Sequence, residues 1–113
     1  MNYRVTILPV AKRQLLEQAL WWSENRSVEQ AYDWLEGFEQ ALASLATNPG
    51  RCVLARENDA LDVVIRELHY GLRRKATHRA VFEIRNDEVL VYSVRHLAQR
   101  DLKPDDLGLP PAR

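Results

Sequence analysis

Residues 78–96, HRAVFEIRNDEVLVYSVRH, contain two apolar runs on either side of Asn86-Asp87. Residues 80–84 and 89–94 are rich in β-branched and aromatic side chains, which favour strands. Asn and Asp tolerate the positive φ angles that a two-residue hairpin turn requires. We therefore expect an antiparallel hairpin in which Arg85 faces Glu88.

This register divides the side chains of the hairpin between two faces, because side chains alternate along a strand. One face is predicted to carry Arg79, Val81, Glu83, Leu90, Tyr92, Val94 and His96. The other is predicted to carry His78, Ala80, Phe82, Ile84, Val89, Val91, Ser93 and Arg95. The second set is the more apolar and should meet the rest of the fold. Arg79 and His96 would then be diagonal neighbours on the outer face, with backbones about 7–8 Å apart.

The N-terminal half predicts one strand and two helices. Residues 3–7 alternate between apolar and polar, as in a strand with one buried face. An amphipathic stripe follows Pro9, which is tolerated at the start of a helix. Ser27 and Gln30 form a capping-box signature for a second helix, whose long apolar stripe ends before Asn48-Pro49-Gly50. The short connection between the helices predicts an antiparallel helical hairpin.

A further run of β-branched and apolar residues, 63–70, completes the order β-α-α-β-β-β. The predicted class is α+β, with the N-terminal strand and the helical hairpin packed on one face of a small antiparallel sheet of about four strands. The opposite face would stay open to solvent or to a partner. The residues expected to be buried are Leu35, Phe38, Leu42, Phe82, Ile84 and Val91.

Residues 1–113 are expected to form a single, monomeric domain, with residues 103–113 as a loosely ordered tail rich in proline and acidic residues. No apolar run is long enough for a membrane span and no signal peptide is recognisable, so a cytoplasmic protein without a membrane partner is expected. Cys52 is the only cysteine, and no spacing of ligand side chains suggests a metal or cofactor.

The formal net charge is zero, with 16 basic and 16 acidic residues, which argues against a strong overall attraction to nucleic acid. The distribution is uneven, because basic residues outnumber acidic residues between Arg66 and Arg100. The C-terminal half is therefore expected to carry a local basic patch.

The order of elements and three short motifs resemble the RelE/ParE superfamily of bacterial toxins, known from type II toxin–antitoxin and plasmid stabilisation systems. The motifs are the Tyr-Arg-Val opening strand, the His-Arg-x-Val-Phe strand at 78–82 and the strand ending in Val94-Arg95-His96. The resemblance spans nearly the whole chain. It implies a growth-inhibiting toxin that a cognate antitoxin protein neutralises. ParE-like members inhibit DNA gyrase, whereas RelE-like members cut messenger RNA on the ribosome, and fold alone does not separate them.

The first candidate function is a ParE-like toxin that inhibits its target, DNA gyrase, by docking. Its target-binding residues would be Arg73, Arg74, Lys75, Arg95 and Arg100. The sequence favours this function because the lysine pair and the terminal tyrosine of many RelE-like enzymes are missing. A third candidate, supported only by the basic stretch, is a non-toxic nucleic-acid-binding domain.

The second candidate is a metal-independent, ribosome-dependent endoribonuclease, so the sequence leaves open whether the chain is an enzyme. The resemblance places Arg79 as the arginine that holds the phosphate. His96 would be the general acid and Glu67 the base. In a purely structural alternative, Arg79 pairs with Glu83, His96 caps a strand end and the basic residues form a solvated loop.

Overall fold

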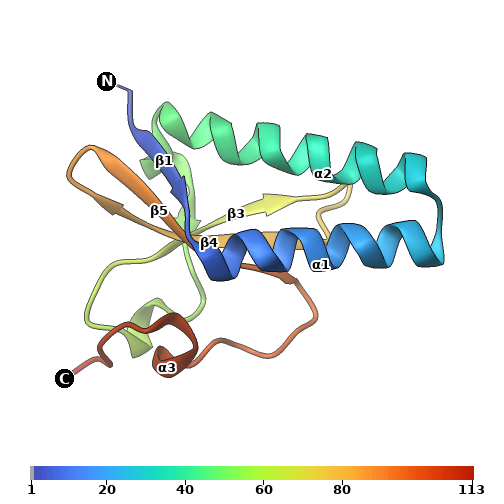
Figure 1. Cartoon of the computed structure of the whole chain (residues 1–113). Coiled ribbons are helices and arrows are strands. Elements are labelled where there is room, and N and C mark those ends of the chain that lie inside the picture. Colours follow the sequence, from blue (N-terminus) through green and yellow to red (C-terminus); the bar gives the residue numbers. More distant parts are fainter. Residues whose placement is uncertain (1) are drawn as a thin grey trace.

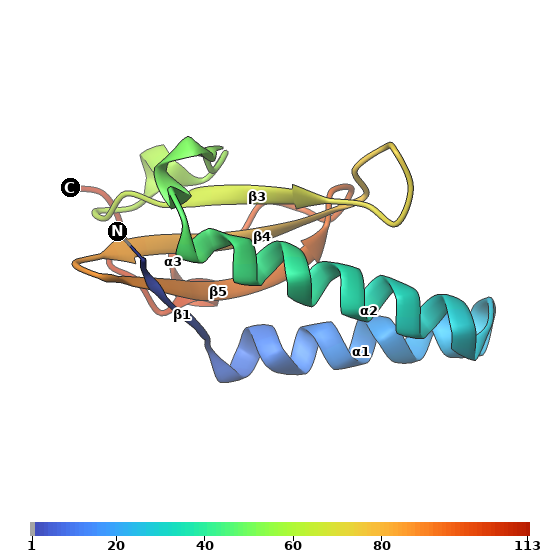
Figure 2. The same cartoon turned by 90° about the horizontal axis from the view of Figure 1, so that it is seen from above.

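The computed structural model describes residues 2–113 and shows a five-stranded sheet with two long helices on one face (Figures 1 and 2). The strand order is β1-β5-β4-β3-β2. The strands are β1 (Arg4–Ile7), β2 (Val53–Leu54), β3 (Arg66–Tyr70), β4 (His78–Arg85) and β5 (Glu88–His96). The helices are α1 (Pro9–Asn25), α2 (Val28–Ala43) and the short α3 (Pro104–Leu107), and three 3₁₀ turns span Ser44–Ala46, Pro49–Arg51 and Asn58–Ala60.

This architecture confirms the predicted α+β class with a helical hairpin on one face of the sheet. Two details differ from the expectation. The two-residue strand β2 adds an edge to the sheet, and β1 runs parallel to β5 while the other neighbours are antiparallel. No helix in residues 2–113 is long and apolar enough to span a membrane.

The helix boundaries follow the expected chemistry. Pro9 occupies the first turn of α1, where its missing N–H leaves no hydrogen bond unmade. The Ser27 side chain accepts a hydrogen bond from the backbone N–H of Gln30 at 3.0 Å, which caps α2. The apolar stripe of this helix faces the sheet, where Trp34, Phe38 and Leu42 are fully buried.

The main core lies between the helical hairpin and the sheet. Phe38, Leu42, Phe82 and Val91 are buried as predicted. Leu35 and Ile84, also expected to be buried, are only partly covered and pack at the edge of the core. The aromatic part of this core continues toward the end of β4, where the ring of Trp34 lies 5.1 Å from that of His78.

Close contact between α2 and β3 depends on Gly37. The Tyr70 hydroxyl donates a hydrogen bond to the backbone carbonyl of Trp34 at 3.1 Å. A Cβ atom on Gly37 would lie 2.2 Å from that hydroxyl oxygen. Only a residue without a side chain therefore lets the tyrosine reach the helix backbone.

A second, smaller core covers the other face of the sheet, which was expected to be open. Its buried members are Ala55, Leu61, Ile65, Val81, Leu102 and Leu107. Figure 1 shows the C-terminal segment and the 3₁₀ turn at residues 58–60 side by side, below the strands and away from α2. The segment expected to be a loose tail instead forms α3, buries Leu107 and pairs Pro111 with Leu61.

A β-bulge breaks the predicted register of the β4–β5 hairpin. The turn is as expected, since Asn86 has a φ of 56° and Arg85 pairs with Glu88. Phe82 pairs with Val91 but Val81 pairs with Ser93, so Tyr92 is an extra residue in β5. Beyond the bulge, the side chains of β5 exchange faces relative to the prediction.

Candidate functional site

Arg79, the predicted phosphate-holding residue, is completely buried in an ionic cluster under the outer face of the sheet. Its Nη1 donates to Glu57 Oε1 at 2.8 Å and to Glu67 Oε1 at 3.3 Å, and its Nη2 donates to Glu57 Oε2. The backbone N–H of Leu102 donates to Glu57 Oε2 at 2.8 Å. The C-terminal segment and the loop that carries Glu57 thus close over the guanidinium.

The members of this cluster stabilise each other's charges. Burial alone would lower the pKa of Arg79, but hydrogen bonds and charge attraction from Glu57 and Glu67 outweigh burial and raise it. Burial alone would likewise raise the pKa of Glu57, but hydrogen bonds from Arg79 and Leu102 lower it. The pair is therefore ionised at neutral pH. The Arg79 Nε has no hydrogen-bond partner within residues 2–113.

Glu67, the predicted base, links the cluster to the surface. Its Oε1 accepts hydrogen bonds from Arg79 and from the backbone N–H of Arg56, at 3.1 Å for the latter. Its Oε2 contacts Nε2 of His69, whose side chain is 47% exposed. Glu67 thus lies beside Arg79 and is one of its two counter-ions.

His96, the predicted acid, lies on the opposite face of the sheet from Arg79. It pairs with His78, and the two imidazole rings are 5.1 Å apart on the helix side. The prediction that Arg79 and His96 share the outer face is therefore wrong. The bulge at Tyr92 is the cause, because one extra residue in β5 moves His96 to the other face.

The predicted target-binding residues divide into two groups. Arg73, Arg74 and Lys75 are exposed in the β3–β4 loop, and within residues 2–113 none of them forms an ion pair. Arg95 is buried and donates a hydrogen bond to the carbonyl of Arg100 at 2.8 Å. Its expected role as a surface contact does not fit this position. The Arg100 side chain is exposed but paired with Asp106.

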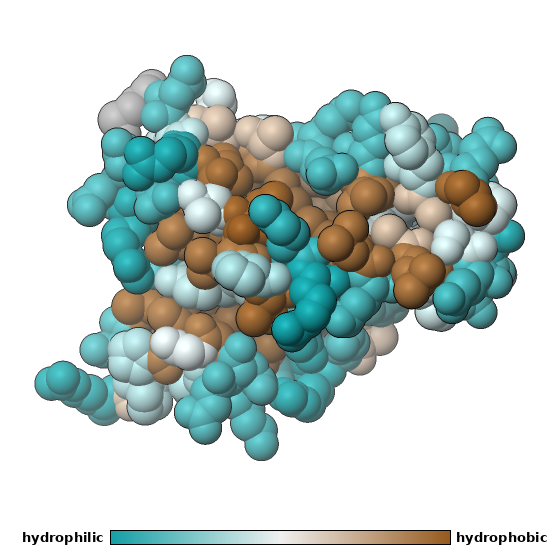
Figure 3. Space-filling view, in the orientation of Figure 1, coloured by the Kyte–Doolittle hydropathy of each residue, from teal (hydrophilic) through white to brown (hydrophobic). Residues whose placement is uncertain are grey.

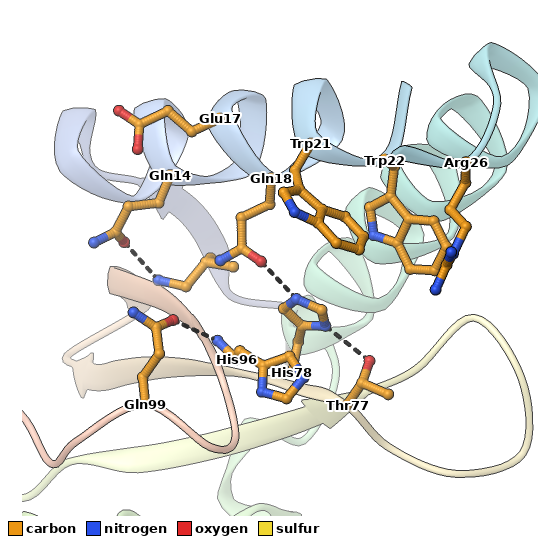
Figure 4. A pocket seen from close by; sticks show the side chains of 11 residues that line it. Gln14, Glu17, Gln18, Trp21, Trp22, Arg26, Thr77, His78, His96 and Gln99 are labelled. Carbon is orange, nitrogen blue, oxygen red and sulfur yellow. Dashed lines mark hydrogen bonds between the residues drawn. The ribbon is translucent and has the colours of Figure 1, made fainter. Parts of the chain in front are cut away.

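A cavity of about 640 Å³ opens between α1 and the ends of β4 and β5 (Figure 4). The sequence-based reasoning missed it, because its walls come from residues far apart in the chain. His78 lies in its wall, where burial and the neighbouring His96 lower the pKa of His78 to about 4. His78 is therefore neutral at pH 7. Its Nδ1 contacts the Thr77 hydroxyl at 2.8 Å, and its Nε2 contacts the amide oxygen of Gln18.

Within residues 2–113, no group of three or more His, Cys, Asp or Glu side chains is arranged to hold a metal ion. The single thiol, Cys52, is half-buried, and burial raises its pKa above the ordinary value. A raised pKa disfavours the thiolate, which is the reactive form.

Comparison with known proteins identifies the family. The sequence pattern of the ParE toxin of type II toxin–antitoxin systems, parDE, matches residues 5–101. A solved structure of the chromosomal ParDE system from P. aeruginosa has a similar fold, with a TM-score of 0.66 at 12% identity over 83% of this chain and 95% of that chain. The structure of an E. coli toxin RelE mutant in the free state has a TM-score of 0.48 at 18% identity, over 87% of this chain and 86% of that chain. A comparison with curated protein sequences found no significant match. The match over residues 5–101 shows that this chain belongs to the ParE toxin family of type II toxin–antitoxin systems.

Proposed function

We propose that this ParE-family toxin stops bacterial growth in the cytoplasm by docking onto DNA gyrase, and that it does not cut RNA. The observation that carries the proposal is the enclosure of Arg79. A phosphate-holding arginine must point N–H groups at the place where charge develops on the substrate. Here both Nη atoms donate to carboxylates and the side chain has no exposed surface.

The separation of the other two candidate catalytic residues supports the same proposal. General acid and base must both reach one reacting phosphate. Glu67 lies beside Arg79 on the outer face, whereas His96 lies on the helix side. The sheet itself stands between them.

The basic loop at Arg73, Arg74 and Lys75 is the proposed contact with the target. These three adjacent cations, which form no ion pair within residues 2–113, make a strong local positive patch on a chain of zero net charge. Such a patch speeds association with an acidic surface and is sensitive to salt. The loop also projects beyond the sheet, toward the side where a short turn joins the two long helices (Figure 2), and its Arg73 and Lys75 line a hollow together with Arg26 and Gln30.

The test is to add purified toxin to DNA gyrase and measure supercoiling and DNA breakage. Reversing the charge of Arg73, Arg74 and Lys75 to glutamate should weaken inhibition by at least tenfold. A matched control, Lys12→Glu with Arg13→Glu, changes two exposed charges near the other end of α1 and should leave inhibition unchanged. Toe-printing of a translated message is run in parallel. Cleavage of the message by the wild-type chain, or full gyrase activity at saturating toxin, would overturn the proposal.

We also propose that the cognate antitoxin covers the outer surface of the helical hairpin. The sequence left the outer face of the sheet open to solvent or to a partner, but the second core occupies that face. Apolar surface is instead exposed on the hairpin, where Figure 3 shows brown patches over α1 and α2. The exposed residues there are Leu16 (59%), Leu20 (57%), Trp21 (50%), Val28 (75%) and Tyr32 (66%).

An apolar surface of this kind marks a protein interaction site, and an amphipathic segment would bury it. Replacing Leu16 and Leu20 by lysine should abolish rescue by the antitoxin while leaving toxicity in place. Val10→Lys serves as a control, because Val10 is an exposed apolar residue near the start of the same helix. Unchanged rescue with the double variant would exclude this surface.

A further inference from the structure

The cavity between α1 and the sheet continues into a second hollow beside the basic loop. The first hollow has a volume of about 640 Å³ and the second about 360 Å³. Both are lined by Trp22, Arg26 and Thr77, so they adjoin each other, and we call the two hollows together the groove. The groove runs from Gln99 at one end to Arg73 and Lys75 at the other. Its size lies in the range of small-molecule sites. The groove shares Arg73 and Lys75 with the proposed gyrase contact, but its larger hollow has no part in that contact or in the ionic cluster.

Flat aromatic rings form the walls of the larger hollow. Figure 4 shows the indoles of Trp21 and Trp22 reaching from α1 toward the sheet, with Trp21 above the imidazoles of His78 and His96, which come from the sheet, and Trp22 to one side of them. The two indoles meet edge to face at 5.7 Å. Trp21 and His96 are exposed and Trp22 is half-buried, so part of each ring is accessible to a ligand.

The polar groups of this hollow are arranged as hydrogen-bond donors. The amide oxygen of Gln14 accepts from the backbone N–H of Val94 at 2.8 Å, and that of Gln99 accepts from the N–H of His96, also at 2.8 Å. The amide oxygen of Gln18 accepts from His78. Each of these oxygens already accepts a hydrogen bond, whereas none of the three NH₂ groups donates one within residues 2–113, so the NH₂ groups are the free donors of this lining.

His96 adds a fourth donor to this wall. Its Nδ1 accepts a hydrogen bond from the backbone N–H of Ala98 at 3.0 Å. The proton of a neutral ring therefore sits on Nε2, where it can be donated. Glu17 is the acidic residue in the lining, and it pairs with Arg13 at 3.5 Å. The hollow thus offers donors to a ring that carries acceptor atoms.

Cations line the other end of the groove. Arg26, Arg73 and Lys75 face the smaller hollow, and within residues 2–113 none of them forms an ion pair. The Arg26 guanidinium lies 5.9 Å from the centre of the Trp21 ring, which holds it at the junction of the two hollows. An anionic group bound there would be adjacent to a ring bound between the aromatic walls.

We propose that this groove binds a nucleotide, with the base between the indole and imidazole rings and the phosphate on Arg26, Arg73 and Lys75. A base has a flat face for stacking and acceptor atoms on its edge, which match the walls and the donors. Its phosphate matches the unpaired cations. The nucleotide is either free or part of a single strand, since both present the same base and phosphate.

The purified full-length chain is titrated with AMP, with adenosine and with an oligoadenylate of five nucleotides. Binding is measured by tryptophan fluorescence and by equilibrium dialysis. AMP should bind at least tenfold more tightly than adenosine, because only AMP reaches the cations. Tighter binding of the oligonucleotide than of AMP assigns the site to a strand, and equal or weaker binding assigns it to a free nucleotide. Absence of binding by AMP and by the oligonucleotide at millimolar concentration would overturn the proposal.

Variants locate the ligand within the groove. His96→Ala should weaken AMP binding about tenfold through loss of stacking, and Arg26→Ala should remove the advantage of AMP over adenosine. Tyr32→Ala is the matched control, because it removes an exposed aromatic ring from α2 outside the groove. Equal affinity of the control and His96→Ala, with wild-type stability in both, would exclude this site. The gyrase assay is independent, so its failure leaves this result standing.

Discussion

Replacing Glu57 by glutamine should destabilise the fold far more than any change on the surface. Arg79 would remain charged with no exposed surface and would keep only Glu67, 3.3 Å away, as a counter-ion. Removing one partner of a buried ion pair costs about 3–5 kcal/mol. Because glutamine keeps one acceptor oxygen, we expect the lower end of this range, about 3 kcal/mol. For a domain of this size that lowers the Tm by about 12 °C.

The measurement is urea unfolding of the wild type and the variant, followed by circular dichroism. Glu17→Gln is the matched control, since Glu17 pairs with Arg13 at 3.5 Å while both side chains are about two-thirds exposed. It should change the free energy of unfolding by less than about 1 kcal/mol. Adding Arg79→Met to Glu57→Gln should recover part of the loss, because the uncompensated charge disappears. Equal, small effects of Glu57→Gln and Glu17→Gln would refute the reasoning.

The same pair predicts a loss of stability in acid. In the folded state the pKa of Glu57 lies below its ordinary value of 4.5. A lowered folded pKa means that the stabilisation is complete above the unfolded pKa and is lost as the pH falls through the folded value. Stability should therefore decrease below about pH 4.5 in the wild type and less steeply in Glu57→Gln.

Three further predictions concern the main core. The pKa of His78 is lowered from 6.5 to about 4 in the folded state, so the free energy of unfolding should decrease as the pH falls from 6.5 toward 4. His78→Gln should make the free energy of unfolding less dependent on pH in that range. Phe38→Ala should lower the free energy of unfolding by about 3–5 kcal/mol, whereas Val28→Ala, at a side chain 75% exposed, should change it by about 0.5 kcal/mol or less. Gly37→Ala should destabilise the fold despite the helix preference of alanine, because the new Cβ meets the Tyr70 hydroxyl; a variant as stable as the wild type in thermal melts would contradict the tight contact.

Local signals in the sequence were sufficient for most of the fold. The cap at Ser27, the stripe of α2 and the turn at Asn86 each depend on neighbouring residues, and the structure has them as predicted. The parallel pairing of β1 with β5 and the second core depend on contacts between distant segments. Periodicity carries no information about such contacts, so the C-terminal segment was predicted to be a loose tail.

In the candidate site, too, local sequence signals predicted some positions, and contacts between distant segments decided the others. Alternation placed Arg79 on the outer face correctly, since β4 is regular from His78 to Arg85. The one extra residue at Tyr92 was enough to move His96 to the other face, and no nearby glycine or proline marks the bulge. Glu57, the main partner of Arg79, comes from a polar connection whose sequence has no period. Glu57 reaches Arg79 only because this connection folds back over the sheet, and no local sequence signal indicates that path.

The position of β1 has a consequence for how the toxin is made. The first strand leaves the ribosome early, yet its partner β5 lies 84 residues later, as the pair Arg4 and Glu88 shows. Closing so long a loop is slow and gains nothing until the last strand is present. During translation the helical hairpin can form alone, but the sheet that holds the Arg79 cluster cannot be completed. Chains released before β5 is synthesised therefore lack the β1–β5 pair and the assembled toxin fold.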